Sequence, residues 1–242
     1  MQKHKEYQEH LRSGEYLGSG ILKSLVEKNP RIRKFYMEHI VVSTRPLKNV
    51  PNVRFAKSVL DIGCSTGRNL DYVGKFLSPG AELYGVDLEK NSAIPESIAF
   101  YQCDVDKDTL PFKDQSFDLV ISTFVLEHLK EPQRLFLESY RVLKGGMYFY
   151  CVTEHYTSIF LPECCNFYTD PTHVRPWTKR SLKTLAIMSG FEVQKVGMIR
   201  YWEFLPTIPL IPIASIITRK NLWPILFHTL CGPIYIIARK PI

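Results

Sequence analysis

The stretch that decides the fold is residues 58–70, SVLDIGCSTGRNL. A mostly apolar run ends in Asp61, the chain passes through glycines at 63 and 67, and a helical pattern begins at about residue 68. Glycine is needed where the backbone bends sharply and where it approaches a ligand without a Cβ in the way. The spacing D-x-G-x-S-x-G differs from the G-x-G-x-x-G order of a dinucleotide site. The stretch therefore predicts a strand, a tight ligand-binding turn and a helix.

The chain beyond residue 51 repeats this alternation of short apolar runs and longer helical stretches. Continuous apolar strands that alternate with helices are typical of a parallel sheet covered by helices on both faces. The fold class is therefore α/β, with a doubly wound sheet. We expect strands at 58–63, 82–87, 100–105, 117–124, 147–153, 191–204 and 233–240, and helices at 68–77, 131–143 and 179–188.

The composition sets broad limits on the function. Hydrophobic residues make up 45% of the 242 residues and charged residues 23%, as in soluble globular proteins. These values exclude a disordered chain, a collagen-like repeat and a polytopic membrane protein. The net charge of +7 favours acidic partners, such as nucleic acid, anionic lipid headgroups or phosphorylated substrates, without selecting among them.

Residues 1–50 form a separate basic segment. Apolar residues at helical spacing predict two helices within 3–45, which would form an N-terminal helical cover for the domain at 51–242. The first twenty residues contain no apolar run, and the six cysteines form no C-x-x-C pair. We therefore expect no cleaved secretory signal, and reduced thiols in a cytoplasmic protein.

Polar residues lie at the carboxyl ends of five successive expected strands. Asp87 closes the second strand, 20 residues (87 − 67) after Gly67, where a carboxylate can accept both hydroxyls of a ribose. Ligands of open parallel sheets bind outside the carboxyl ends of the strands, where the strand order reverses. The repeated polar ends therefore predict a nucleotide-type site. The residues at these five ends are Asp61, Asp87, Asp104, Ser122 with Thr123, and 153–155.

Residues 58–191 resemble a class I S-adenosylmethionine-dependent methyltransferase of the small-molecule type. The segments that carry the resemblance are the glycine loop, Asp87, QCDVDKDTLPFKDQSFDLVIS at 102–122, EHL at 127–129 and RVLKGG at 141–146. The resemblance implies a Rossmann-like sheet of seven strands in the order 3-2-1-4-5-7-6, with the last strand in sequence antiparallel. It also implies that the cofactor is S-adenosyl-L-methionine and that the protein is a transferase.

The same resemblance implies roles for individual residues. The glycines would let the backbone approach the methionine part of the cofactor, with Asp61 steadying the loop. Asp87 would bind the ribose, and Asp104 with Val105 would contact the adenine. Family members usually have glycine where this chain has Ser65, and we expect serine to be tolerated if its φ need not be positive. The expected cofactor-binding residues are Asp61, Gly63, Cys64, Ser65, Gly67, Asp87, Leu88, Asp104, Val105 and Ser122.

The segment after the fourth strand narrows the choice of methyl acceptor. Amino-methylases of nucleic-acid bases or glutamine usually carry an (Asn/Asp)-Pro-Pro-aromatic motif there, and C5-pyrimidine enzymes carry Pro-Cys, whereas residues 121–124 read ISTF. We therefore expect no nucleic-acid partner. Acceptors with hydroxyl, carboxyl, carbon or simple amine groups stay open. Because 168–178 resembles the acceptor loop of methyltransferases found near sugar and polysaccharide genes, we expect a small-molecule hydroxyl, on a saccharide or a lipid-linked compound.

A hydroxyl acceptor needs a general base, for which a neutral imidazole is suited near physiological pH. The expected catalytic residues are His128, His155 and His173, with Glu127 and Asp170 as further candidates. Glu154, His155, Asp170 and His173 are potential metal ligands, but no i, i+4 pair or tight cluster organises them. We therefore predict no metal site.

An apolar insertion at 205–232 interrupts the end of the domain. Five prolines between 206 and 233 and the basic pair at 219–220 break it into arms shorter than the roughly 20 residues of a membrane span. Two interpretations stay open. We favour packing on the domain or in a homodimer interface over contact with a membrane surface or a lipid-linked acceptor.

Two other functional classes share parts of this pattern. A nicotinamide-dependent oxidoreductase also has a strand, a glycine turn and an acidic residue, but the glycine order and the absence of a plausible Tyr-x-x-x-Lys pair disfavour it. A membrane-surface binding protein that keeps the fold without catalysis is the third class.

Overall fold

The computed structural model describes residues 42–161, 166–200, 209, 211–218 and 232–242. The chain divides into two compact units, 1–45 and 46–242, and the second contains the sheet. Both expected N-terminal helices and most of the insertion at 205–232 lie outside the described residues. Next to these segments in the sequence, the structure describes the 3-10 helix η1 (Val42–Asn49), and within the insertion it describes the helix α7 (Ile211–Thr218).

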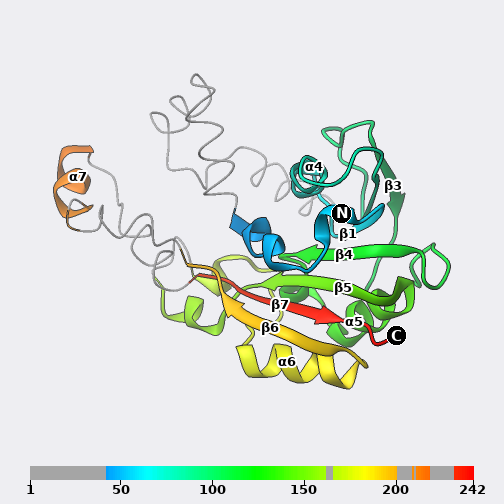
Figure 1. Ribbon diagram of the computed structural model, residues 1–242. Helices are drawn as coiled ribbons and strands as arrows, with labels where there is room; N and C mark the ends of the chain where they lie inside the picture. Colours follow the sequence, from blue (N-terminus) through cyan, green and yellow to red (C-terminus); the bar gives the residue numbers. More distant parts are fainter. Residues whose placement is uncertain (1–41, 162–165, 201–208, 210, 219–231) are drawn as a thin grey trace. The chain divides into compact units, whose positions relative to one another are not determined.

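Seven strands form one sheet in the order β3-β2-β1-β4-β5-β7-β6 (Figure 1). The strand β7 is antiparallel to both of its neighbours, and the other pairings are parallel. The predicted strand order and the antiparallel last strand are therefore confirmed. The strands are β1 (Ser58–Ile62), β2 (Glu82–Asp87), β3 (Ile98–Gln102), β4 (Phe117–Thr123), β5 (Leu143–Thr153), β6 (Glu192–Met198) and β7 (Ile234–Arg239).

Some predicted boundaries are wrong. The third strand spans 98–102 rather than 100–105, because the backbone turns after Cys103 and the carbonyl of Asp104 accepts hydrogen bonds from the next residues of the turn. The first helix of the domain, α4 (Arg68–Gly74), ends three residues before the predicted end at residue 77. The helices α5 (Pro132–Val142) and α6 (Lys179–Met188) lie close to their predicted positions.

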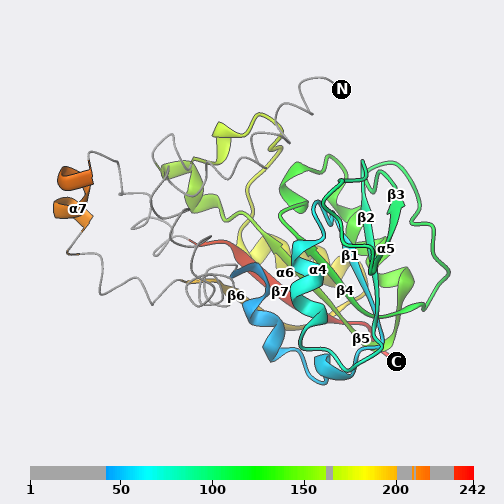
Figure 2. The same ribbon diagram turned by 90° about the horizontal axis from the view of Figure 1, so that it is seen from above.

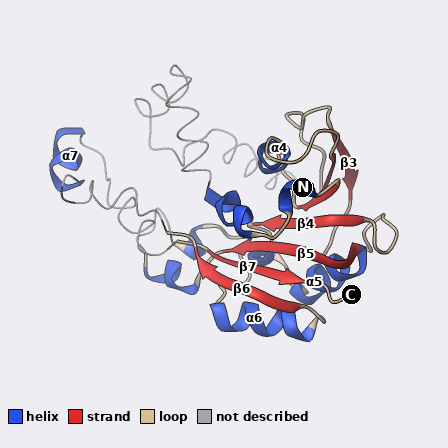
Figure 3. Cartoon of the chain, viewed as in Figure 1, coloured by secondary structure: helices blue, strands red, loops and turns tan. Residues whose placement is uncertain are grey.

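Helices cover both faces of the sheet (Figure 2). Side chains alternate between the faces of a strand, so one face of each strand is given by every second residue. Leu60 of β1 lies in the same buried cluster as Phe136 of α5 and Leu182 of α6. The opposite face carries Thr123 of β4, whose hydroxyl accepts a hydrogen bond from Asn69 of α4 at 2.7 Å. The sheet is therefore buried between α4 on one side and α5 with α6 on the other (Figure 3).

The start of α6 fixes the end of a long loop after β5. The hydroxyl of Thr178 accepts a hydrogen bond from the backbone of Ser181, and the Ser181 hydroxyl accepts one from the backbone of Thr178, which is a capping box. The helix ends before Gly190, whose φ of 91° confirms the predicted glycine cap. Both ends of α6 are thus set by residues at or next to the ends of the helix.

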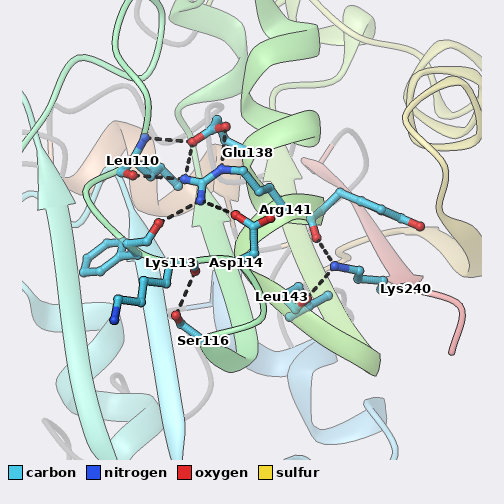
Figure 4. A network of polar contacts seen from close by, with 10 residues as sticks. Leu110, Lys113, Asp114, Ser116, Glu138, Arg141, Leu143 and Lys240 are labelled. Atoms are coloured by element: carbon cyan, nitrogen blue, oxygen red, sulfur yellow. Dashed lines mark hydrogen bonds and ion pairs between the residues drawn. The ribbon is translucent and has the colours of Figure 1, made fainter.

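A network centred on Arg141 ties the segment before β4 to α5 (Figure 4). The guanidinium donates to the carbonyl oxygens of Leu110 and Phe112 at 3.0 and 2.7 Å and contacts the carboxylates of Asp114 and Glu138 at 2.9 and 2.8 Å. Glu138 also accepts a hydrogen bond from the Leu110 amide at 2.7 Å. These bonds position the segment that leads into the central strand β4.

Among the described residues no helix is both long enough and apolar enough to cross a membrane.

We expect Arg141→Met to lower the free energy of unfolding by about 1–3 kcal/mol, because the partly buried Glu138 carboxylate and two carbonyl groups lose their partner. Urea unfolding measures the change. Lys75→Ala is the control, since the ion pair of Lys75 with Asp71 is exposed and is worth less than about 0.5 kcal/mol. Equal losses in the two variants would contradict the role of the network.

Candidate active site

The turn after β1 depends on two glycines in left-handed conformations. Gly63 has a φ of 79° and Gly67 a φ of 71°. The amides of Gly63 and Cys64 donate to the carbonyl of Val86 on β2, at 2.7 and 3.0 Å. A Cβ built on Gly63 would overlap a methyl group of Val125, in the loop after β4. The turn is therefore held between β2 and the loop after β4, and it has no room for a side chain at Gly63.

Ser65 adopts the conformation that would suit glycine. Its φ is 47°, so the condition under which we expected serine to be tolerated is not met. The strain is offset by a hydrogen bond, since the Ser65 amide donates to Oδ2 of Asp87 at 2.7 Å. The other carboxylate oxygen of Asp87 accepts from the Leu88 amide at 2.7 Å. Asp87 and the glycine turn therefore face each other, as the predicted site requires.

Asp61 is fully buried directly before this turn, and neither carboxylate oxygen has a hydrogen-bond partner among the described residues. Burial and, to a smaller extent, the charge of Asp87 raise the pKa of Asp61 to about 8. A buried carboxyl without partners is costly unless a bound group satisfies it. A cationic or hydrogen-bond-donating ligand in the turn would do so.

The remaining predicted cofactor residues fall into two groups. Ser122 donates to the carbonyl of Ile62 at 3.0 Å, so its hydroxyl links β4 to the end of β1. Asp104 contacts Lys107 at 2.6 Å within the turn after β3. The side chain of Val105 is buried in the core cluster, whereas that of Leu88 is exposed. Contacts of these residues with a cofactor stay predictions.

The loop after β4 carries residues that the sequence did not mark for the cofactor site. Phe124 has a φ of 57°, which is rare for a bulky residue, and its side chain is 39% exposed. Such strained positions cluster at ligand sites. The φ of a residue has no direct sequence signal, so Phe124 could only have been found by its place after the fourth strand.

Three candidate residues converge beside this loop. Glu127 and His128 lie in η3 (Leu126–His128), and His173 lies in the loop before α6. The imidazole rings of the two histidines have centroids 4.7 Å apart. One candidate ligand atom of each of the three residues lies within 4.8 Å of the other two. We call these three residues the Glu-His-His cluster.

Hydrogen bonds fix the residues of the Glu-His-His cluster. Glu127 is buried and accepts from the Thr153 hydroxyl at the end of β5, at 2.9 Å. Burial raises the pKa of the Glu127 carboxyl to about 8, and the charge of the nearby Glu154 adds to this effect. Nδ1 of His128 lies 2.8 Å from the Thr172 hydroxyl, and Nδ1 of His173 lies 2.7 Å from the carbonyl oxygen of Phe167.

The other two candidate bases take different places. His155 lies outside the Glu-His-His cluster, where its Nδ1 contacts the Thr157 hydroxyl at 2.8 Å. Burial lowers the pKa of His155, and the charge of Lys179 lowers it further. Asp170 is buried beside His173, with one carboxylate oxygen 3.6 Å from Nε2 of the imidazole. Of the three expected catalytic histidines, the structure therefore brings His128 and His173 together and leaves His155 apart.

We expect Gly63→Ala to destabilise the protein more than Gly80→Ala. Both glycines have a positive φ, 79° and 86°, but a Cβ at Gly80 would meet nothing within 4 Å. Gly80→Ala therefore measures the backbone cost alone, about 1 kcal/mol, and Gly63→Ala adds about 1–3 kcal/mol of overlap with Val125. Urea unfolding separates the two, and equal losses would show that Val125 does not confine the turn.

We expect Asp61→Asn to stabilise the ligand-free protein, and to do so increasingly as the pH rises from about 4 to about 8. The folded-state pKa of about 8 lies above the usual value of 3.8, so the wild type binds more protons when folded and loses stability over this range. Thermal unfolding at pH 5 and pH 8.5 should show a difference of at least about 1 kcal/mol.

Asp118→Asn is the control for this comparison, because Asp118 is paired with Lys144 at 2.8 Å and its substitution should destabilise. A stabilisation by Asp61→Asn that is the same at both pH values would contradict the buried, unpaired state of Asp61.

Comparisons with known proteins agree with this geometry. Residues 60–151 match the methyltransferase domain family. The malonyl-[acyl-carrier protein] O-methyltransferase of Marinomonas sp. is 35% identical over 115 residues, which are 45% of this chain and 42% of that protein. The chain thus spans less than half the length of curated relatives such as this one.

Solved structures share the fold. A chain in the complex of the Haloferax volcanii Trm112 methyltransferase activator with a methyltransferase has a TM-score of 0.68 and 18% identity, with 93% of this chain and 99% of that one covered. Phosphoethanolamine N-methyltransferase 2 of Haemonchus contortus, in complex with S-adenosyl-L-methionine, has a TM-score of 0.61 and 18% identity, with 93% and 61% covered. With the facing glycine turn and Asp87, these findings show that residues 60–151 match a methyltransferase domain and that the chain shares the fold of these methyltransferase structures.

Proposed function

We propose that the protein transfers a methyl group from S-adenosylmethionine to a hydroxyl group of a small-molecule acceptor. The observation that carries the proposal is the position of the Glu-His-His cluster. Glu127 and His128 follow strand β4, and the loop that joins them to β4 lies against the glycine turn. The loop residue Val125 contacts Gly63, and Glu127 lies two residues further along. Cofactor and acceptor groups would therefore meet at the carboxyl ends of β1, β4 and β5.

The residues of the turn fit this cofactor. Asp87 offers a carboxylate at the position where a ribose is bound in nucleotide-binding sheets. The carboxyl of Asp61, which has no hydrogen-bond partner among the residues that the structure describes, suits a positively charged ligand, and S-adenosylmethionine carries both a sulfonium and an ammonium group. The two glycines allow the sharp bend that places the Ser65 amide against Asp87.

Hydrogen bonds indicate which nitrogen of each imidazole is protonated. The Thr172 hydroxyl donates to the Asp170 carboxylate at 2.6 Å, so it can only accept from Nδ1 of His128. The carbonyl of Phe167 likewise can only accept from Nδ1 of His173. In the neutral form of each imidazole, these bonds place the proton on Nδ1.

A lone pair on Nε2 can take the proton of an acceptor hydroxyl. The acceptor oxygen then attacks the methyl carbon in line, the new C–O bond forms as the C–S bond breaks, and neutral S-adenosylhomocysteine leaves. The protein supplies alignment, a proton acceptor and the exclusion of water.

The nature of the acceptor beyond its hydroxyl group is part of the proposal. The Marinomonas and Haemonchus proteins are named for carboxyl and amine acceptors, so the family fold is compatible with several acceptor groups. We propose a saccharide or lipid-linked compound because of the loop at 168–178 and the apolar insertion at 205–232. In the described part of that insertion, Ile213 and Ile216 of α7 are 58% and 78% exposed. Such side chains would suit contact with a lipid-linked acceptor, a membrane surface or a second copy of the chain.

We also propose a cytoplasmic location. The described cysteines Cys64, Cys103 and Cys151 are free thiols, in agreement with a reducing compartment.

Isothermal titration with S-adenosylmethionine tests the first half of the proposal. We expect wild-type protein to bind one equivalent and Asp87→Ala to bind about 10- to 100-fold more weakly, since the ribose hydroxyls lose about 1–3 kcal/mol of hydrogen bonding. Glu89→Ala, which removes an exposed carboxylate two residues away, should leave the affinity unchanged. A flat titration of folded wild-type protein would overturn the methyltransferase proposal. Wild-type affinity of Asp87→Ala would overturn the ribose contact alone.

Release of S-adenosylhomocysteine in the presence of saccharide and lipid-linked hydroxyl compounds tests the second half. Turnover with amine or carboxyl compounds alone would contradict a hydroxyl acceptor. Quenching of NADH fluorescence, by contrast, would favour a nicotinamide-dependent oxidoreductase.

A further inference from the structure

We propose that the Glu-His-His cluster, Glu127 with His128 and His173, binds a divalent transition-metal ion that coordinates the acceptor. This inference deepens the proposed function. Only the role of the ion in methyl transfer rests on that function, because the binding site is inferred from the three side chains alone. It departs from the expectation that no metal is bound. That expectation considered His173 with residues 154, 155 and 170, and the structure instead places it beside Glu127 and His128.

The separations within the cluster suit a shared ion. Ligand atoms bonded to one Zn²⁺ at about 2.0–2.2 Å lie roughly 3–4.4 Å from one another, depending on the angle between them. The three candidate atoms here lie within 4.8 Å of one another. Small side-chain rotations would close the remaining gap. His173 lies in a loop that is held at Thr178 by the cap of α6 and at Val174 by a backbone hydrogen bond to Glu127, at 2.8 Å.

A second observation points to a ligand at this place. Glu127 is 1% exposed, and while Oε2 accepts from Thr153, Oε1 has no hydrogen-bond partner among the described residues. A buried carboxylate oxygen left unsatisfied destabilises the folded protein. A cation bound by Oε1 would remove this cost. It would also offset the negative charge of the neighbouring Glu154 and Asp170 carboxylates.

The histidines are already oriented as metal ligands usually are. A metal-binding imidazole generally donates its other N–H to a carbonyl, a carboxylate or another acceptor, which fixes the ring and its tautomer. Nδ1 of His173 donates to the Phe167 carbonyl, and Nδ1 of His128 donates to a threonine hydroxyl that is bound in turn by Asp170. Both imidazole rings are therefore fixed in place beside Glu127.

The donor set indicates the class of metal. Two imidazole nitrogens and one carboxylate oxygen suit Zn²⁺, Mn²⁺, Fe²⁺ or Co²⁺ rather than Ca²⁺, which prefers oxygen ligands alone. Three protein ligands leave positions open for a water or an acceptor oxygen. Such an open site is typical of a metal that acts on a substrate rather than one that stabilises the fold.

The bound ion would take over the role of a free base. Coordination lowers the pKa of a hydroxyl group, so the acceptor loses its proton to solvent and presents an alkoxide oxygen to the methyl group. The C–O bond then forms as the C–S bond breaks, without oxidation or reduction. In the metal-bound protein His128 and His173 would hold the ion, and they would act as proton acceptors only in the metal-free protein.

Titration of chelator-treated full-length protein with Co²⁺ tests the site directly, because the visible absorption of Co²⁺ reports nitrogen and oxygen ligands. We expect one equivalent to bind, and Glu127→Gln and His173→Ala each to lower the affinity at least tenfold. Glu131→Gln removes an exposed carboxylate nearby and should leave the affinity unchanged. Zn²⁺ should displace the Co²⁺ signal from the same site.

Absence of a Co²⁺ spectrum in folded wild-type protein would overturn the proposal, as would equal affinities in the wild type and both cluster variants. Circular dichroism and the S-adenosylmethionine titration show whether each variant is folded, and His173→Gln replaces any variant that is not. Cofactor binding without metal binding would overturn the metal site alone. Metal binding without cofactor binding would leave the site and overturn the methyltransferase proposal.

Discussion

The structure depends on one constraint, the confinement of the glycine turn after β1 between β2 and the loop after β4. The turn needs left-handed backbone at three positions, and Ser65 adopts it although it is not glycine. Two contacts hold it there: Asp87 accepts the Ser65 amide from one side, and Val125 fills the space beside Gly63 from the other. The position of the turn is therefore set by the neighbouring strand β2 and by the loop after β4.

Much of the sheet could be predicted because its signals are local. Apolar strands, the glycine spacing and the acidic residue 20 positions beyond Gly67 lie within short stretches of sequence, and together they specify β1, β2 and the turn. The boundary of β3 was missed because the run ending at Val105 stays apolar at alternate positions after the backbone has turned. The alternation of apolar residues indicates which side chains are buried, and Cys103 and Val105 are still buried after β3 has ended at Gln102.

The Glu-His-His cluster could not be assembled from sequence for a different reason. Glu127 and His173 are 46 residues apart (173 − 127), and they meet only because the loop after β5 returns to η3. The backbone amide of Val174 bonds to the carbonyl of Glu127 at 2.8 Å, and this contact has no signature in either segment. Each residue was a candidate base, but their proximity is a property of the tertiary structure.

The loop after β4 joins the two halves of the site. Within seven residues, Ser122 bonds to the end of β1, Val125 packs on Gly63, and Glu127 with His128 enters the cluster. Both halves also contain a buried carboxyl, at Asp61 and at Glu127, with an oxygen that has no partner within the described part of the chain. A chain selected only for stability would replace such groups with apolar or amide side chains. Two bound groups would satisfy these carboxyls: a cationic cofactor at Asp61 and, as we propose, a metal ion at Glu127 that holds the acceptor oxygen to which the methyl group is transferred.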